Sequence, residues 1–142
     1  TLFKSGTHPD YTADVGRHVF SYALLPHNGF STEAVIRPGY EFNIPPVVLP
    51  GGTTAQAPLI EVKTPNIVVE AVKWAEKGSA FIVRLYEAER NRTRTALKLG
   101  VPFKSIAQVD MLEERPEPLV AQAGIVMLDF RPFEIKTLRI EV

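Results

Sequence analysis

Hydrophobic and polar positions alternate along several stretches of the chain, and a period of two predicts β-strands. From Gly16 to Leu25, the side chains at even and odd positions would form two faces of a strand, and both faces are largely apolar. One face carries His18, Phe20, Tyr22 and Leu24, and the other carries Val19, Ser21, Ala23 and Leu25. This pattern predicts a strand covered on both faces. The Pro26-His27-Asn28-Gly29 stretch has the chemistry of a turn and is expected to end it.

Further strands are predicted in the second half of the chain. Ile67 to Trp74 begins with β-branched residues and is interpreted as a strand, although Val69, Val72 and Ala75 could also line one face of a short helix. Ala80 to Ala88 and Thr93 to Leu99 flank a polar turn and are predicted to form a hairpin. The remaining predicted strands are Phe103 to Leu112, Gly124 to Phe130 and Phe133 to Val142. Short strands at this spacing predict an all-β fold, an antiparallel β-sandwich.

The last predicted strand changes the parity of its apolar residues near Thr137. Phe133 and Ile135 are apolar at odd positions, whereas Leu138 and Ile140 are apolar at even ones. Strand side chains alternate strictly, so burying both sets requires a bulge or a move from one sheet to another. An irregularity is therefore predicted at Thr137.

Alternation is weak between His27 and Asn66, a segment that holds six of the twelve prolines. Ser31-Thr32-Glu33 could open one short helix, which Pro38-Gly39 is expected to stop. The rest is predicted to be one long, Pro-rich connection, and connections of this length are usually functional or packed against something.

Length and composition narrow the class of protein. The 142 residues are expected to form a single domain, residues 1–142. Sixteen basic and sixteen acidic residues balance, and no apolar run approaches the roughly 20 residues of a membrane span, so neither nucleic acid nor a membrane is an expected partner. The chain has no cysteine and starts without methionine or a signal peptide, which favours the cytoplasm and an excised piece of a larger protein.

Familiar catalytic and metal-binding motifs are missing from the sequence. It has no HExxH, GxSxG or phosphate-binding glycine loop. His8, His18 and His27 match no zinc spacing. The acidic cluster of Glu113, Glu114 and Glu117 is interpreted as a solvated loop, because no calcium-ligand spacing accompanies it.

One polar segment is a candidate binding site. Thr7-His8-Pro9-Asp10-Tyr11, followed by Asp14, combines groups that can hydrogen-bond sugar hydroxyls with an aromatic ring beside a proline turn. The simpler interpretation is that Pro9-Asp10 makes an ordinary turn and Tyr11 packs on a sheet. We take His8, Asp10, Tyr11 and Asp14 as candidates for a substrate cleft or a domain interface, on a loop at the rim of the sandwich.

Several of these stretches together resemble the C-terminal region of the family 38 α-mannosidases. The similar segments, in chain order, are Lys4 to Asp10 with Ala13-Asp14, Gly16 to His27, Val72 to Glu76 with Val83 to Ala88, and Pro132 to Leu138. They cover nearly the whole chain. Lys4, where arginine is expected, and the glycine missing from the Glu89 to Arg92 turn depart from the family pattern.

The resemblance implies a parent enzyme that is a retaining α-mannosidase with a catalytic aspartate, a carboxyl acid/base and zinc. These groups would lie in an N-terminal catalytic domain outside this chain, so no catalytic residue, metal ligand or cofactor is expected here. The chain would then be the β-domain that buttresses the catalytic domain, within a larger super-sandwich, and it could also edge a cleft for mannose-containing carbohydrate.

Alternatives to this role are an independent carbohydrate-binding module and, third, an independent hydrolase. Aromatic residues make up 9% of the chain and include a single tryptophan, Trp74, which offers little of the flat platform a module needs. If the catalytic domain is missing, an apolar patch is expected over Tyr40 to Pro50, through which the chain could form a homo-oligomer.

Overall fold

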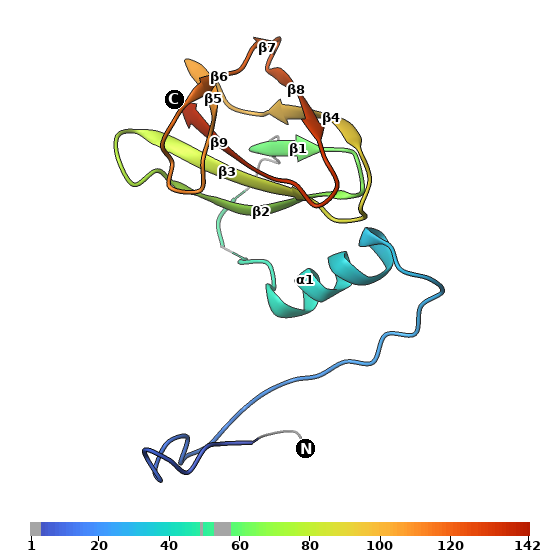
Figure 1. Ribbon diagram of the computed structural model, residues 1–142, viewed down its shortest axis with the longest axis vertical. Coiled ribbons are helices and arrows are strands. Elements are labelled where there is room, and N and C mark those ends of the chain that lie inside the picture. The colour runs from blue at the N-terminus through green and yellow to red at the C-terminus, as the bar shows by residue number, and fades with distance from the viewer. Residues whose placement is uncertain (1–3, 49, 53–57) are drawn as a thin grey trace.

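The computed structural model describes residues 4–48, 50–52 and 58–142, and its strands form two antiparallel sheets packed face to face (Figure 1). The first sheet has the order β1 (Ile60–Val62), β4 (Thr93–Leu99), β8 (Ile125–Phe130) and β7 (Ala121–Gln122). The second has the order β2 (Ile67–Trp74), β3 (Ala80–Glu87), β9 (Ile135–Glu141), β5 (Ser105–Val109) and β6 (Glu117–Pro118). The predicted antiparallel β-sandwich is confirmed.

Apolar side chains from both sheets form one core between them. In the second sheet, Phe81, Val83 and Leu85 of β3 lie beside Leu138 and Ile140 of β9. The first sheet contributes alternate residues of β4 and β8, namely Leu97, Leu99, Val126, Leu128 and Phe130. The alternating pattern of these strands therefore places every second side chain in the core, as a sandwich requires.

The predicted hairpin between Ala80 to Ala88 and Thr93 to Leu99 is wrong. These segments are β3 and β4, which belong to different sheets, and β3 instead forms a hairpin with β2. The polar turn at Glu89 to Arg92 is a corner by which the chain passes between the sheets. A short polar turn can join two strands of one hairpin or carry the chain to the opposite sheet, so the sequence did not distinguish these two connections. The strand interpretation of Ile67 to Trp74 is confirmed.

The irregularity predicted at Thr137 is also wrong. β9 pairs with β3 in one continuous register, from Ala80 opposite Glu141 to Tyr86 opposite Ile135. The parity change has a simpler cause, because Ile135 points away from the core and is 54% exposed, while Leu138 is fully buried. The bulge lies instead in β2, between Val69 and Ala71.

One helical segment precedes the sandwich, as a π-helical turn, η1 (Thr32–Ile36), that continues into α1 (Arg37–Asn43). The Ser31 hydroxyl caps its start by accepting a hydrogen bond from the Ala34 N–H at 3.0 Å. Pro38 does not end the helix as predicted, because it lies in the first turn of α1, where a missing N–H costs little.

The strand predicted from Gly16 to Leu25 is not formed. Residues 17–27 belong to no helix or strand, and neither sheet contains any of them. This N-terminal arm, residues 4–30, runs away from the sandwich (Figure 1). No helix among the described residues is long and apolar enough to cross a membrane.

The acidic loop between β5 and β6 packs over the outer face of the second sheet rather than standing free in solvent. The Glu113 side chain is only 7% exposed and forms an ion pair with Lys73 at 2.7 Å. Its other oxygen accepts a hydrogen bond from the Glu76 N–H at 2.8 Å. The backbone oxygen of Met111 accepts from Arg84 of β3. The interpretation of Glu113 as solvated is therefore wrong, whereas Glu114 and Glu117 are exposed.

Candidate functional site

The candidate residues His8, Asp10, Tyr11 and Asp14 lie in a compact turn near the start of the arm. Asp10 organises it, because its Oδ1 accepts hydrogen bonds from the Thr12 N–H at 2.8 Å and the Thr12 hydroxyl at 2.7 Å. These bonds, first the hydroxyl and then the backbone one, hold the pKa of Asp10 below its usual value. The peptide bond from His8 to Pro9 is cis.

Asp14 closes the other side of this turn. Its Oδ2 accepts a hydrogen bond from the Ser5 hydroxyl at 2.9 Å, and its backbone oxygen lies 2.6 Å from Nε2 of His18. All four candidate side chains are exposed, and Tyr11 packs on no sheet. The structure thus brings them together in one turn on the arm, away from the sandwich (Figure 1). Their predicted place at the rim of the sandwich is therefore wrong, because the arm that carries them leaves the sandwich. Their contact with a sugar or a second domain stays a prediction.

The rest of the arm is dominated by exposed apolar side chains. Seven large apolar side chains between the turn and the helix are exposed to solvent: Val15, Val19, Phe20, Tyr22, Leu24, Leu25 and Phe30. Phe42 near the end of the helix and Ile44, Val47 and Val48 beyond it are also exposed, which agrees with the apolar surface expected in the Tyr40 to Pro50 segment. A row of this length is unusual on the surface of a folded monomer and marks an interaction surface.

The helix between the arm and the sandwich is anchored at both ends. At its start, the Thr32 N–H donates to a carboxylate oxygen of Glu89 at 2.6 Å. Near its end, the Tyr40 hydroxyl donates to Glu70, the residue in the β2 bulge, and lies 3.4 Å from the Tyr86 hydroxyl. The bond to Glu70, followed by that to Tyr86, raises the pKa of Tyr40. The helix therefore fixes where the arm leaves the sandwich.

A buried carboxylate, Glu87, joins the loops at the same end of the sandwich. The residue has no exposed surface, and its Oε1 accepts from the Asn66 side-chain amide and the Glu89 N–H, both at 2.8 Å. Its Oε2 accepts from the Phe133 N–H at 2.9 Å. Burial alone raises the pKa of Glu87, but these hydrogen bonds outweigh it, so the pKa lies below its usual value.

Glu87 was not singled out from the sequence, although a signal was available. It shares the core-facing parity of Phe81, Val83 and Leu85 in β3, where a charged residue requires hydrogen-bond partners. Its role is structural, because all the partners that hold it are this chain's own backbone and amide groups.

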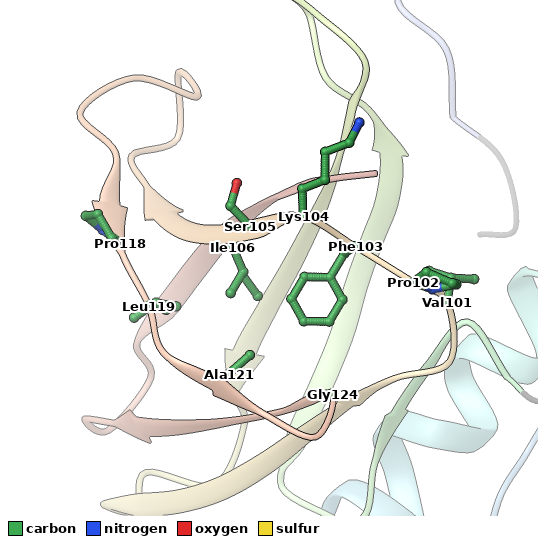
Figure 2. Close-up of a pocket in the computed structure, with 10 residues that line it drawn as sticks. All are labelled: Val101, Pro102, Phe103, Lys104, Ser105, Ile106, Pro118, Leu119, Ala121 and Gly124. Carbon is green, nitrogen blue, oxygen red and sulfur yellow. The ribbon is translucent and has the colours of Figure 1, made fainter.

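Two of the hollows on the described part of the sandwich have no acidic residue in their lining. One lies between residues 101–106 and 118–124, where Phe103 and Ile106 point inward while Lys104 and Ser105 point away (Figure 2). None of the ten residues that line it is acidic. The other is an apolar groove beside Trp74, which is 71% exposed at the end of β2. Glycoside hydrolysis needs two carboxyls across one bond, and neither hollow offers them.

The part of the chain that the structure describes contains no candidate metal site. Residues 4–48, 50–52 and 58–142 contain no group of three or more histidine, aspartate or glutamate side chains placed to hold an ion.

The comparisons with known proteins point to one family. The model of the glycosyl hydrolases family 38 C-terminal beta sandwich domain matches residues 66–138. These residues run from Asn66, just before β2, to Leu138 in β9.

Curated relatives match over almost the whole chain. The chain is 36% identical to Alpha-mannosidase 2C1 of Homo sapiens, with 97% of this chain covered, and 34% identical to Alpha-mannosidase G of Dictyostelium discoideum, with 98% covered. Alpha-mannosidase of Saccharomyces cerevisiae is 25% identical over 99% of the chain. The chain spans only 14% of the length of the first two relatives and 15% of the third.

Proposed function

Because this chain belongs to family 38 of the glycosyl hydrolases, as its C-terminal β-sandwich domain, we propose that it is a non-catalytic part of an α-mannosidase. In this role it buttresses the catalytic domain and presents its arm to it. The observation that carries the proposal is the arm: its apolar side chains are exposed here, although their pattern is that of buried ones.

The chemistry of cleavage then belongs to the rest of the protein. A catalytic domain outside this chain would hold the aspartate, the acid/base and zinc, and mannose-containing carbohydrate would be its substrate. The lack of cysteine supports a cytoplasmic location. In the isolated chain, the exposed apolar arm would favour a homo-oligomer.

An activity comparison tests this division of labour. The full-length protein is expected to hydrolyse 4-nitrophenyl α-mannoside, and the 142-residue chain is expected to release no 4-nitrophenol above background. In calorimetry, the chain alone should bind methyl α-mannoside no more tightly than millimolar. Turnover by the chain alone, or an inactive full-length protein, would contradict the proposal.

An independent carbohydrate-binding module is the second candidate, and the exposure of Trp74 favours it. Tryptophan offers a flat apolar face on which a sugar ring could stack. The groove beside Trp74 is lined mainly by apolar side chains, however, and sugar recognition also needs precisely oriented polar groups. Micromolar mannoside binding that is lost in Trp74→Ala would favour the module over the buttress.

The polar turn on the arm is proposed to contact either the sugar or the catalytic domain, and Asp10→Ala in the full-length protein separates the two. If Asp10 supports a domain contact, the variant should unfold at a lower temperature with kcat/KM nearly unchanged. If the turn reaches the sugar, loss of a hydrogen bond should cost about 1 to 3 kcal/mol in kcat/KM with folding intact. A variant identical to wild type in both measurements would exclude both roles.

A further inference from the structure

The arm carries a segment whose composition is that of a strand inside a sheet. Residues 18–25 contain no charged residue and no proline, and large or small apolar side chains stand at both parities. Edge strands usually carry lysine, proline or bulges that prevent further pairing, and this segment has none of them. Both its side-chain faces and both its backbone edges are thus suited to being covered.

The backbone of residues 19–25 is the second feature of this segment. Among the described residues, no backbone–backbone hydrogen bond joins residues 19–25 to another element. Burying Phe20, Tyr22 and Leu24 would take water away from the N–H and C=O groups between them. Buried backbone groups need hydrogen-bond partners, and in a strand these lie on alternate sides.

The free sheet edges of the sandwich fit this segment poorly. β2 is the long edge strand, but it is bulged between Val69 and Ala71, and α1 is bonded to the bulge residue Glu70 through Tyr40. A bulge of this kind ends regular pairing. The other edge strands are short, because β1 spans only Ile60–Val62 and β6 and β7 span two residues each. A strand of about eight residues therefore needs another sheet to pair with. Neither the sandwich of this chain nor the same sandwich in a second copy offers a suitable edge.

We propose that residues 18–25 form an interior strand of a β-sheet whose flanking strands come from the part of the protein outside this chain. This rests on the proposed function, because that part is the remaining length of the family relatives, of which this chain spans 14%. The aromatic face, with Phe20 and Tyr22, and the smaller face, with Ser21 and Ala23, would both be packed. Through its arm, this chain would thus share a sheet with the rest of the protein rather than meet it only through side chains.

Hydrogen–deuterium exchange on the full-length protein tests the strand directly. Amides of residues 19–25 are expected to exchange at least about 100-fold more slowly there than in the 142-residue chain. Equal, fast exchange in both proteins would overturn the proposal. Slow exchange in the 142-residue chain alone, together with a dimer in light scattering, would also overturn it, in favour of a second copy.

A pair of proline variants then distinguishes an interior strand from an edge strand. Tyr22 and Ala23 are adjacent, so their N–H groups point to opposite neighbours, and Tyr22→Pro and Ala23→Pro each remove one of them. An interior strand predicts that both variants speed exchange of the segment at least about tenfold. If only one variant does so, the segment is an edge strand and the interior assignment is wrong.

Two controls keep these results specific. Tyr22→Ala removes the ring but keeps the N–H, and it should speed exchange less than Tyr22→Pro does. Amides of β3 should stay protected in every variant, which shows that the sandwich remains folded. Because the readout is exchange, a failure of the strand proposal is distinguishable from a failure of the mannosidase assay.

Discussion

Replacing Glu87 by alanine is expected to lower the free energy of unfolding of this chain by about 3–5 kcal/mol. The substitution leaves the Asn66 amide and the N–H groups of Glu89 and Phe133 without their shared acceptor. Each buried donor that loses its partner costs about 1–3 kcal/mol, and the cavity adds to this. Urea denaturation followed by the fluorescence of Trp74 measures the loss.

Glu114→Ala is the matched control, since it removes an exposed glutamate of the same sandwich. Its effect is expected to stay within about 0.5 kcal/mol. If Glu87→Ala lowers the free energy of unfolding by less than about 1 kcal/mol, the loops that contain Asn66, Glu89 and Phe133 do not depend on this carboxylate.

The same carboxylate gives the stability a defined dependence on pH. The pKa of Glu87 lies below its ordinary value of 4.5 in the folded chain, so the folded state favours the ionised form of this side chain. Its contribution is therefore complete above that ordinary value and is lost as pH falls through the lower, folded pKa. The stability difference between wild type and Glu87→Gln should be constant near neutral pH and shrink in acid. A difference that grows in acid would contradict this assignment.

The strands of the sandwich could be predicted from the sequence because their burial is decided within this chain. In β8, every second residue is apolar and packs in the core, and in β4 the buried positions alternate in the same way with exposed ones, so the pattern and the structure coincide. The connection from β3 to β4 could not be predicted in the same way. A polar turn satisfies its own backbone whether the next strand pairs with the last one or enters the opposite sheet.

The arm shows the opposite limit of reading a pattern. The pattern of residues 16–25 predicts a strand, but a strand forms only beside other strands, and neither sheet of the described residues includes this segment. Likewise, the sequence grouped His8, Asp10, Tyr11 and Asp14, and the structure does place them in one turn, held by Asp10 and Asp14. What that turn touches depends on groups outside it.

β9 offers a second large effect, because Leu138 and Ile135 are similar in size but differ in position on the same strand. Leu138 is fully buried between the sheets, while Ile135 is more than half exposed on the outer face. Leu138→Ala is expected to cost about 2–5 kcal/mol, the sum of lost burial and a residual cavity. Ile135→Ala should cost about 0.5 kcal/mol or less.

Urea denaturation of the 142-residue chain measures both variants of β9 against wild type. The comparison also tests the register, because a bulge at Thr137 would turn Ile135 and Leu138 toward the same core. In that case the two variants would lose similar amounts of stability, and the continuous pairing of β9 with β3 would be wrong. A large loss for Leu138→Ala alone would mean that alternation in β9 runs unbroken from Ile135 to Glu141, and that the apolar side chain of Ile135 belongs to the surface.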